Sequence, residues 1–530
     1  MESTDRSTTK ISCGGVYLLL LVPVTLFTIS LFIRPAMVFD TAAGFAVFRS
    51  MLEGAPFNYG FSPDPSNIAN DIETFLTWWS PGQYLVPGAF VWLDTSYGLA
   101  ISLTALLASV IGVLGWIWIA RGYEVSCFVL SFFVAGLVAF HYTTSSFRLY
   151  SGGEVLLFAA LPWSLSALVW AAQRRPLLSF AISLMAAVLL FFAKLSGLFA
   201  FAATVAAISL LDLWKRRQLT SSLLAMWAGS MVAALLIYAF WVARGPTPVT
   251  GAAYTITWPI VLFPIAAAVF SGYSLHELLD WLFLHPSAPI LSGITQTSYV
   301  LGPLGLVLLG WAWFRLRKTR YRPMAIFLLA IIAIYTAAFI AMYVRSATVV
   351  PFEERYFRYA GILSFLLLLV AIDQWQAPLA KVIPILIVAT FAAYGLTSYA
   401  NAAREFARGD HYDQASGTSM LSVSPVVLEY LRSEMAVHHW QHAIAVVPEP
   451  EAANGLPGFR IIFSFHLLDS APLEDITHQR WAGRTDKIFV IMNRRMRGSG
   501  KEDAVLKTFV DYDFEAWDRK EIDGMLVDSQ

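Results

Sequence analysis

Eleven long apolar runs, separated by shorter polar stretches, restrict what this chain can fold into more than any other feature. Each is about as long as a helix needs to cross a hydrocarbon core of roughly 30 Å, and the shortest only just reach it. Because backbone groups in lipid must hydrogen-bond within their own segment, we predict that the runs are helices. They lie at 16–33, 99–120, 125–141, 154–172, 177–193, 196–213, 221–243, 298–314, 324–343, 359–372 and 382–399.

Composition agrees with a membrane protein. Charged residues make up 14% of the 530 residues, whereas roughly a quarter of a soluble domain is charged. We therefore predict an all-α polytopic membrane protein. A shorter apolar run at 259–271 contains two prolines, which favours a re-entrant or interfacial segment over a twelfth span. The two cysteines, Cys13 and Cys127, precede or lie inside apolar runs, and we expect no disulfide between them.

The chain divides into two parts by charge. Residues 401–530 contain 14 Lys and Arg against 20 Asp and Glu, and residues 1–400 contain 22 against 16. We predict a transmembrane domain at 1–400, with an outer loop at 34–98, and a soluble extracytoplasmic domain at 401–530. The second domain mixes helical and strand-like patterns, which indicates a small α/β fold. The helical pattern covers 425–435, and the strand-like runs are 443–447, 460–465 and 487–492.

Basic residues set the expected orientation, because cytoplasmic loops of membrane proteins are enriched in Lys and Arg. With the N-terminus in the cytoplasm, all the strongly basic loops face the cytoplasm. They contain Arg121, Arg174, Arg175, Lys215, Arg216, Arg217, Arg315, Arg317, Lys318, Arg320 and Arg322. The odd number of spans then puts the 401–530 domain outside. We expect a multi-pass protein of a bacterial plasma (inner) membrane.

The outer loop at 34–98 holds the acids of greatest interest. Asp40 comes about seven residues after the first apolar run, where partial desolvation can raise a carboxyl pKa and make the group a useful base. A solvated loop acid or a helix N-cap explains it equally well. Asp71 and Glu73 form a D-x-E pair that could contact the acceptor or hold Mg²⁺ or Mn²⁺, since these cations prefer oxygen ligands. The alternative is an ordinary charged loop.

Two further features of this membrane face concern aromatic and basic side chains. Trp78 and Trp79 are typical of an interfacial aromatic anchor, and they could also form a wall for a sugar ring. Lys194 lies between two apolar runs with almost no loop between them. A lysine buried there is costly and suggests a function, although snorkelling of the side chain to the interface would also explain it.

Charged residues also appear in two later outer segments. Arg148 and Glu154 flank a loop whose Gly152-Gly153 pair would let the backbone approach a ligand. The segment 353–359 reads EERYFRY. Its two arginines, three residues apart, would share a helix face and could clamp a phosphate, since guanidinium groups bind phosphate bidentately. Glu353 and Glu354 would hold Arg355 and Arg358 in place. An interfacial cluster of ion pairs is the alternative.

These motifs, in this order, resemble the GT-C superfamily of integral-membrane glycosyltransferases, in particular its protein-mannosyltransferase and aminoarabinose-transferase branch. The resemblance covers residues 1–400. It rests on the acid after the first span, a G-x-P-x-x-Y motif, a W-S-P-G-x-Y return, a Lys-x-x-Gly and a Glu-Arg-Tyr. In this sequence these are Asp40, Gly54–Tyr59, Trp79–Tyr84, Lys194–Gly197 and Glu354–Tyr356. Many relatives have two adjacent acids after the first span, whereas here Thr41 follows Asp40.

The resemblance implies a fold and an activity. It implies a GT-C-like membrane domain that transfers a hexosyl or pentosyl group from a polyprenyl-phosphate donor, with inversion, to a glycan, lipid or protein acceptor. Asp40 would be the catalytic base. Lys194, Arg355 and Arg358 would bind the donor phosphate, while Trp78, Trp79 and an amphipathic segment at 272–290 would close the site. A divalent cation is the one cofactor considered, and no nucleic-acid partner is expected.

A transporter or flippase of a lipid-linked glycan, or an assembly factor, is the alternative function. A transporter would be expected to have inverted repeats and ionisable residues near the membrane midplane. The notable charges of this chain instead cluster at the outer ends of the predicted spans. A cavity lined by Asp40, Lys194 and Arg355 would favour the enzyme, and a central pathway would favour transport.

Overall fold

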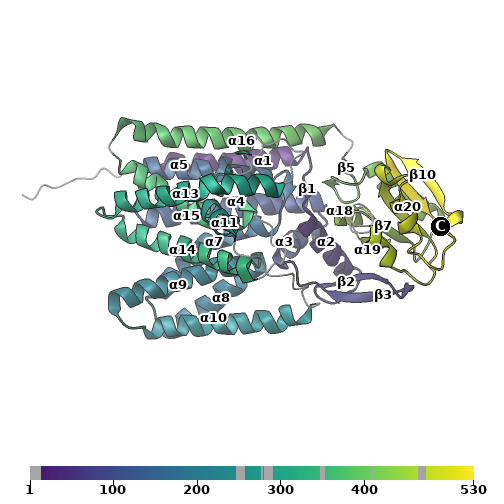
Figure 1. Ribbon diagram of the computed structural model, residues 1–530, viewed down its shortest axis with the longest axis horizontal. Coiled ribbons are helices and arrows are strands. Elements are labelled where there is room, and N and C mark those ends of the chain that lie inside the picture. Colours follow the sequence, from purple (N-terminus) through teal and green to yellow (C-terminus); the bar gives the residue numbers. More distant parts are fainter. Residues whose placement is uncertain are drawn as a thin grey trace, which may run out of the picture.

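The computed structural model describes residues 13–245, 257–275, 278–279, 290–345, 353–375, 377–408, 411–463 and 473–530. Among these residues, eleven helical segments are long and apolar enough to cross a membrane. They lie side by side as one bundle, at the left of Figure 1. The eleven predicted spans are therefore confirmed as helices.

The helices of the bundle follow the apolar runs closely, with short breaks inside some spans. In chain order they are η1 (Cys13–Leu20), α1 (Leu21–Ser30), α4 (Tyr97–Gly122), α5 (Cys127–Ala139), α6 (His141–Ser145), α7 (Gly153–Ala171), α8 (Pro176–Ala193), α9 (Gly197–Arg216), α10 (Ser221–Phe240), η2 (Val242–Arg244), α13 (Ile290–Leu316), α14 (Arg322–Arg345), η3 (Glu354–Phe357), α15 (Arg358–Asp373), η4 (Pro378–Lys381) and α16 (Val382–Ala407). Helix α15 is the most buried of the spanning segments, so it forms the centre of the bundle.

The short apolar run is a separate helix, α11 (Trp258–Phe270). It packs against α13, α14 and α15. Its second half is almost entirely buried, from Ala266 to Phe270, so α11 lies within the bundle rather than on its surface. The predicted amphipathic segment at 272–290 falls mostly outside the described residues.

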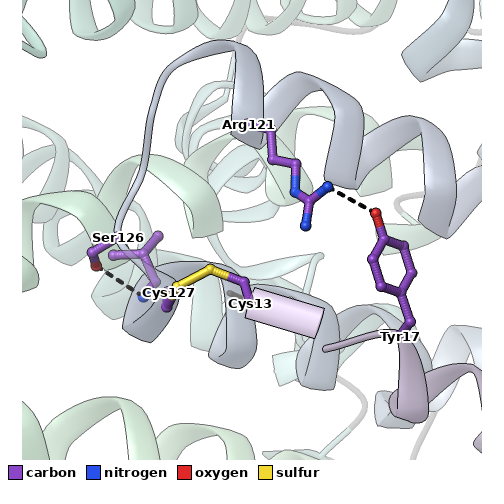
Figure 2. The surroundings of a disulfide bond; sticks show 6 residues. Cys13, Tyr17, Arg121, Ser126 and Cys127 are labelled. Atoms are coloured by element: carbon purple, nitrogen blue, oxygen red, sulfur yellow. Dashed lines mark hydrogen bonds between the residues drawn. A yellow bond between two sulfur atoms is a disulfide. The ribbon is translucent and has the colours of Figure 1, made fainter. Parts of the chain in front are cut away.

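The expectation that the two cysteines stay apart is wrong. Cys13 and Cys127 form a disulfide, with their Cα atoms 5.7 Å apart. Figure 2 shows the bridge joining η1 to the first residue of α5, close to the hydrogen bond that Arg121 donates to the Tyr17 hydroxyl. The sequence places the cysteines 114 residues apart, and only the packing of η1 against α5 brings them together.

The disulfide makes a direct prediction for the purified protein. We expect that denatured protein, prepared without a reductant, does not react with a maleimide, because both thiols are bonded to each other. After reduction, two labels per chain are expected by mass spectrometry. Labelling of either cysteine before reduction would contradict the bridge.

The residues between α1 and α4 form a small layer at one end of the bundle. This layer contains β1 (Ala36–Met37), α2 (Phe39–Leu52), the hairpin β2 (Tyr59–Asp64) with β3 (Asn67–Phe75), and α3 (Gly82–Val91). Strand β1 pairs in parallel with β4 (Leu149–Tyr150), just before α7. In Figure 1, α2 lies between the helical bundle and the C-terminal domain, and the β2–β3 hairpin extends along the lower edge of that domain.

The C-terminal α/β domain, residues 411–463 and 473–530, is built on a five-stranded sheet of order β10-β11-β9-β7-β8. Strand β7 (Ile444–Val447) pairs in parallel with β8 (Arg460–Phe463) and β9 (Ile488–Asn493), and β11 (Met525–Ser529) pairs antiparallel to β9 and β10 (Asp518–Ile522). The other elements are β5 (Tyr412–Asp413), β6 (Thr418–Ser419), α17 (Pro425–His438), α18 (Pro450–Asn454), α19 (Leu473–His478), η6 (Arg494–Met496), α20 (Gly500–Leu506) and η7 (Phe514–Ala516). The predicted helix and the three predicted strands are all present as α17, β7, β8 and β9.

Candidate functional site

A cavity of about 470 Å³ opens where the layer formed by the residues between α1 and α4 meets the bundle. Four charged side chains singled out in the sequence line it, namely Asp40, Glu154, Lys194 and Arg355, together with Tyr356. These residues come from α2, α7, the α8–α9 turn and η3, and the first and last of them are 316 positions apart in the sequence. The remaining lining residues are Trp78, Trp79, Ser80, Gln83, Ala193, Leu195, Ser196, Phe199, Phe339 and Met342.

Asp40 stands in the first turn of α2, at the mouth of this cavity. Its carboxylate is partly exposed, and Oδ2 lies 3.7 Å from Nη2 of Arg355. The backbone carbonyl of Asp40 accepts a hydrogen bond from the side-chain amide of Gln83. An acid in the first turn also interacts favourably with the helix dipole. The carboxylate is thus held beside a cation while still open to the cavity.

Lys194 forms an ion pair with Glu154. Helix α8 ends at Ala193, and the extended backbone of Lys194 turns the chain before α9 begins. The Glu154 side chain is only 8% exposed. A buried charge of this kind requires a partner, so the ion pair explains why a lysine is tolerated between two apolar helices. Burial lowers the pKa of the Lys194 ammonium group, and the Glu154 carboxylate opposes this shift.

The glycine pair before α7 makes room for this ion pair. Gly152 has a φ of +46°, and a Cβ there would lie 2.6 Å from Cβ of Gln83. A Cβ on Gly153 would lie 3.2 Å from the Lys194 side chain. The backbone at this glycine pair therefore lies close to side chains of the protein itself.

Arg355 connects the carboxylates around the cavity. Its Nε lies 3.6 Å from Oε1 of Glu154, and its guanidinium also pairs with Glu353. Burial raises the pKa of the Glu353 carboxyl, and the Arg355 charge opposes that shift. The Tyr356 ring lies beneath both cations, 4.9 Å from Nζ of Lys194 and 5.2 Å from Cζ of Arg355. Lys194 and Arg355 are therefore fixed close together on one wall of the cavity.

Trp78 and Trp79 also line the cavity. Trp79 packs edge-to-face against Phe39, the residue before Asp40, with ring centroids 6.2 Å apart. Trp78 packs against Trp79 and is 67% exposed. An exposed indole at the mouth of a polar cavity can pack against a sugar ring.

Three other residues predicted from the sequence to belong to the site do not line this cavity. Arg358 begins α15 and donates to the Thr143 hydroxyl, while its guanidinium stacks on Tyr142 and Phe158. Arg355 lies in the 3₁₀ turn η3 that leads directly into α15, and both arginines line a second, small pocket together with Glu154. Arg148 donates to the carbonyl of Ser398. Glu354 is buried, and it is absent from the described lining of the cavity.

Asp71 and Glu73 lie on strand β3, outside the cavity. Asp71 Oδ1 accepts from Nε and Nη2 of Arg460 in the C-terminal domain, at 3.0 and 2.7 Å. The described residues contain no group of three or more His, Cys, Asp or Glu side chains that could hold a metal ion. A divalent cation at Asp71 and Glu73, as considered from the sequence, would have to compete with the Arg460 guanidinium.

Sequence reasoning missed several polar residues of the cavity. Ser80 and Gln83 follow Trp79 in the W-S-P-G-x-Y return, and that motif was the available signal for them. Glu353, which is absent from the described lining of the cavity, was expected to hold an arginine, and it pairs with Arg355. Ser196 gave no signal apart from its position beside Lys194.

Known structures provide the remaining comparison. No protein-family model matches this chain, and no curated protein matches it. Among solved structures, the chain is similar to ArnT from Cupriavidus metallidurans bound to undecaprenyl phosphate, with a TM-score of 0.56, 12% identity, and 98% of each chain covered. It is also similar to the apo state of that ArnT, with a TM-score of 0.53, 12% identity, and 97% of this chain and 98% of that chain covered. Over nearly its whole length, the C-terminal domain included, the chain therefore has the fold of ArnT, the GT-C-like fold that its motifs predicted.

Proposed function

We propose that the protein is an inverting membrane glycosyltransferase that moves a sugar from a polyprenyl-phosphate carrier to an acceptor hydroxyl. The observation that supports this most strongly is that Asp40, Lys194 and Arg355 line one cavity. Such a transfer requires a base, here a carboxylate, to take the proton of the acceptor hydroxyl. It also requires fixed cations to stabilise the departing phosphate. The likeness to an ArnT bound to undecaprenyl phosphate agrees with a polyprenyl-phosphate donor.

The proposed reaction is a single displacement. The acceptor oxygen attacks the anomeric carbon of the sugar while Asp40 takes the hydroxyl proton. A new glycosidic bond forms, the bond between the anomeric carbon and the phosphate oxygen breaks, and its electron pair leaves with the polyprenyl phosphate. General-base catalysis by a positioned carboxylate contributes typically about 10²- to 10⁴-fold to such a rate.

Lys194 and Arg355 would stabilise the departing phosphate, because fixed cations are most effective where negative charge develops. Glu154 holds both cations before the donor binds. Arg358 lies behind Glu154, in a small pocket that both side chains line. In this proposal it adds positive charge to the site without touching the phosphate.

The acceptor would enter beside Asp40, where Trp78 and Trp79 offer a surface for a sugar ring. The proposal covers a glycan, lipid or protein acceptor, and a hexosyl or pentosyl donor. We place the cavity at the extracytoplasmic face, on the basis of the basic loops at the other ends of the spans. A donor already attached to a lipid suits that location, since nucleotide sugars are made in the cytoplasm.

The function is tested by incubating purified protein with a panel of polyprenyl-phosphate sugars and candidate acceptors. We expect release of polyprenyl phosphate and a sugar-modified acceptor, both detected by mass spectrometry. A panel of nucleotide sugars serves as the matched control and should give no product. Movement of an intact lipid-linked glycan across vesicles, without bond cleavage, would contradict the proposal.

Donor binding should depend on pH through Lys194. Because burial lowers the pKa of this group below its ordinary 10.5, Lys194 loses its proton at a lower pH than a free lysine does. The cationic form disappears as the pH rises through this lowered pKa, so the donor KM should increase on the alkaline side. Lys194→Arg should move this increase to higher pH, since guanidinium stays protonated. An unchanged alkaline profile in Lys194→Arg would contradict the assignment.

A further inference from the structure

The C-terminal domain contacts the segment of the chain that carries Asp40. Three parts of that segment touch the domain: the residues before β1, the helix α2, and the β2–β3 hairpin. Yet the described residues that line the catalytic cavity all come from the membrane part and its outer layer. The domain can therefore influence the reaction only through the elements that it holds.

Arg49 makes the main contact on α2. Its guanidinium donates to the carbonyl of Ala453, at 2.7 Å, and to that of Phe459. It also pairs with Glu53 on the next turn of the same helix. The Arg49 side chain is 12% exposed, so these bonds lie in a largely buried interface. The side-chain amide of Asn454 adds a hydrogen bond to the Ala42 carbonyl, two residues from Asp40.

The two faces of α2 meet different parts of the protein. Phe45 and Phe48 are fully buried in a cluster with side chains of the membrane part, including Tyr84 and Ile101. Ala46 instead packs against the apolar core of the C-terminal domain. Since α2 is enclosed from both sides, its position depends on both contacts.

The hairpin is held by a second arginine. Arg460 pairs with Asp71 and donates to the carbonyls of Ile68 and Asn70, at 2.6 Å each. The side chain of Ile68 is fully buried in the core of the C-terminal domain. Its backbone N–H donates to the carbonyl of Ala482 at 2.7 Å. The hairpin is thus anchored by charge, by backbone bonds and by apolar burial.

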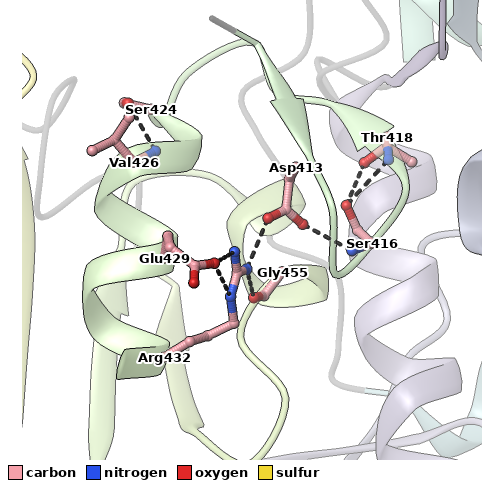
Figure 3. Close-up of polar contacts among 8 residues, drawn as sticks. All are labelled: Asp413, Ser416, Thr418, Ser424, Val426, Glu429, Arg432 and Gly455. Carbon is pink, nitrogen blue, oxygen red and sulfur yellow. Dashed lines mark hydrogen bonds and ion pairs between the residues drawn. The ribbon is translucent and has the colours of Figure 1, made fainter. Parts of the chain in front are cut away.

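The third contact precedes β1. Ser419 on β6 donates from its N–H to the Pro35 carbonyl and from its hydroxyl to the Arg34 carbonyl, at 3.1 and 2.6 Å. Side-chain bonds also fix the β5–β6 hairpin, which carries Ser419. Figure 3 shows Arg432 of α17 bridging Asp413 on β5 and the carbonyl of Gly455 after α18, at 2.7 and 2.6 Å. This brace joins the parts of the domain that contact β1 and α2.

We propose that the C-terminal domain clamps α2, and that Arg49 is a positioning residue that sets Asp40 relative to the Lys194–Arg355 pair. Asp40 and Arg49 are nine residues apart, about 13 Å along one helix. A rigid helix of that length transmits a shift at Arg49 to Asp40. Lys194 and Arg355 lie on the α8–α9 turn and on η3, which this shift would leave in place. The role rests on the proposed function, because it assigns the clamp to the base of that reaction.

Arg49→Gln in the full-length protein tests the clamp. We expect kcat to fall about tenfold while the KM for the polyprenyl-phosphate donor stays within about twofold, because misplacing a reacting group by 1 Å can cost up to about 100-fold in rate. Arg49→Lys should recover part of the loss. In an Asp40→Asn background, Arg49→Gln should have no further effect. Arg497→Gln is the control, since Arg497 is an exposed arginine of the C-terminal domain that pairs with Glu521, away from α2.

Asp71→Asn is an independent test of the clamp. It weakens the ion pair between Asp71 and Arg460 at the edge of the interface and removes no buried arginine. It should lower kcat a fewfold at constant donor KM, even if Arg49→Gln does not fold. Unchanged kcat in a folded Arg49→Gln protein, or a donor KM that rises as much as kcat falls, would overturn the clamp. An inactive wild-type protein would instead overturn the proposed function, so the two failures are distinguishable.

Discussion

Replacing Asp40 with Asn is expected to lower kcat by about 10²- to 10⁴-fold, the contribution typical of a general base. An amide of the same shape accepts no proton, so the acceptor hydroxyl would have to attack while still protonated. In the proposed reaction, the donor phosphate would contact Lys194 and Arg355 rather than Asp40. Binding of undecaprenyl phosphate to Asp40→Asn should therefore match that of the wild type.

Asp94→Asn is the control for this substitution. Asp94 is an exposed acid of the same outer loop with a φ of +61°, a conformation that asparagine tolerates well. It should leave both kcat and donor KM unchanged. Full activity in Asp40→Asn, with folding verified by thermal unfolding, would remove Asp40 from the reaction.

Replacing Lys194 with Met is expected to weaken binding of undecaprenyl phosphate at least thirtyfold. Losing one partner of a buried charge pair at a binding site costs about 2–5 kcal/mol, and 1.36 kcal/mol corresponds to a factor of ten. The measurement is a binding titration on purified protein. Undecaprenol, which lacks the phosphate, should bind the two proteins equally.

Lys194→Met also leaves Glu154 without its nearest cation, which should lower the free energy of unfolding. The double variant Glu154→Gln/Lys194→Met removes both charges and separates the two effects. It should recover thermal stability while binding of undecaprenyl phosphate stays weak. Recovery of binding along with stability would show that Lys194 only balances Glu154.

Much of the membrane part could be predicted because its signals are local. Each spanning helix is a continuous apolar run, and lipid leaves such a run few alternatives to a helix. Asp40, Lys194 and Arg355 stood out for a related reason, since charges at the edges of apolar runs are costly. The sequence therefore indicates which charged side chains are candidates for the site, but it does not show how they are arranged.

What the sequence could not show were contacts set by packing between distant segments. The Glu154–Lys194 pair depends on α7 lying against α8, and the Cys13–Cys127 bridge depends on η1 lying against α5. Asp71 was a candidate for an acceptor or metal contact, with an ordinary charged loop as the alternative, and nothing in the sequence indicates its partner Arg460, which lies 389 residues away.

The anomeric configuration of the first-formed product tests the central claim most directly. A single base at Asp40, acting in one displacement, predicts that the new glycosidic bond has the configuration opposite to that of the donor. NMR of the product from a donor of known configuration gives this result without any variant. Inversion is the outcome expected here, and a product that retains the donor's configuration would contradict the assigned mechanism.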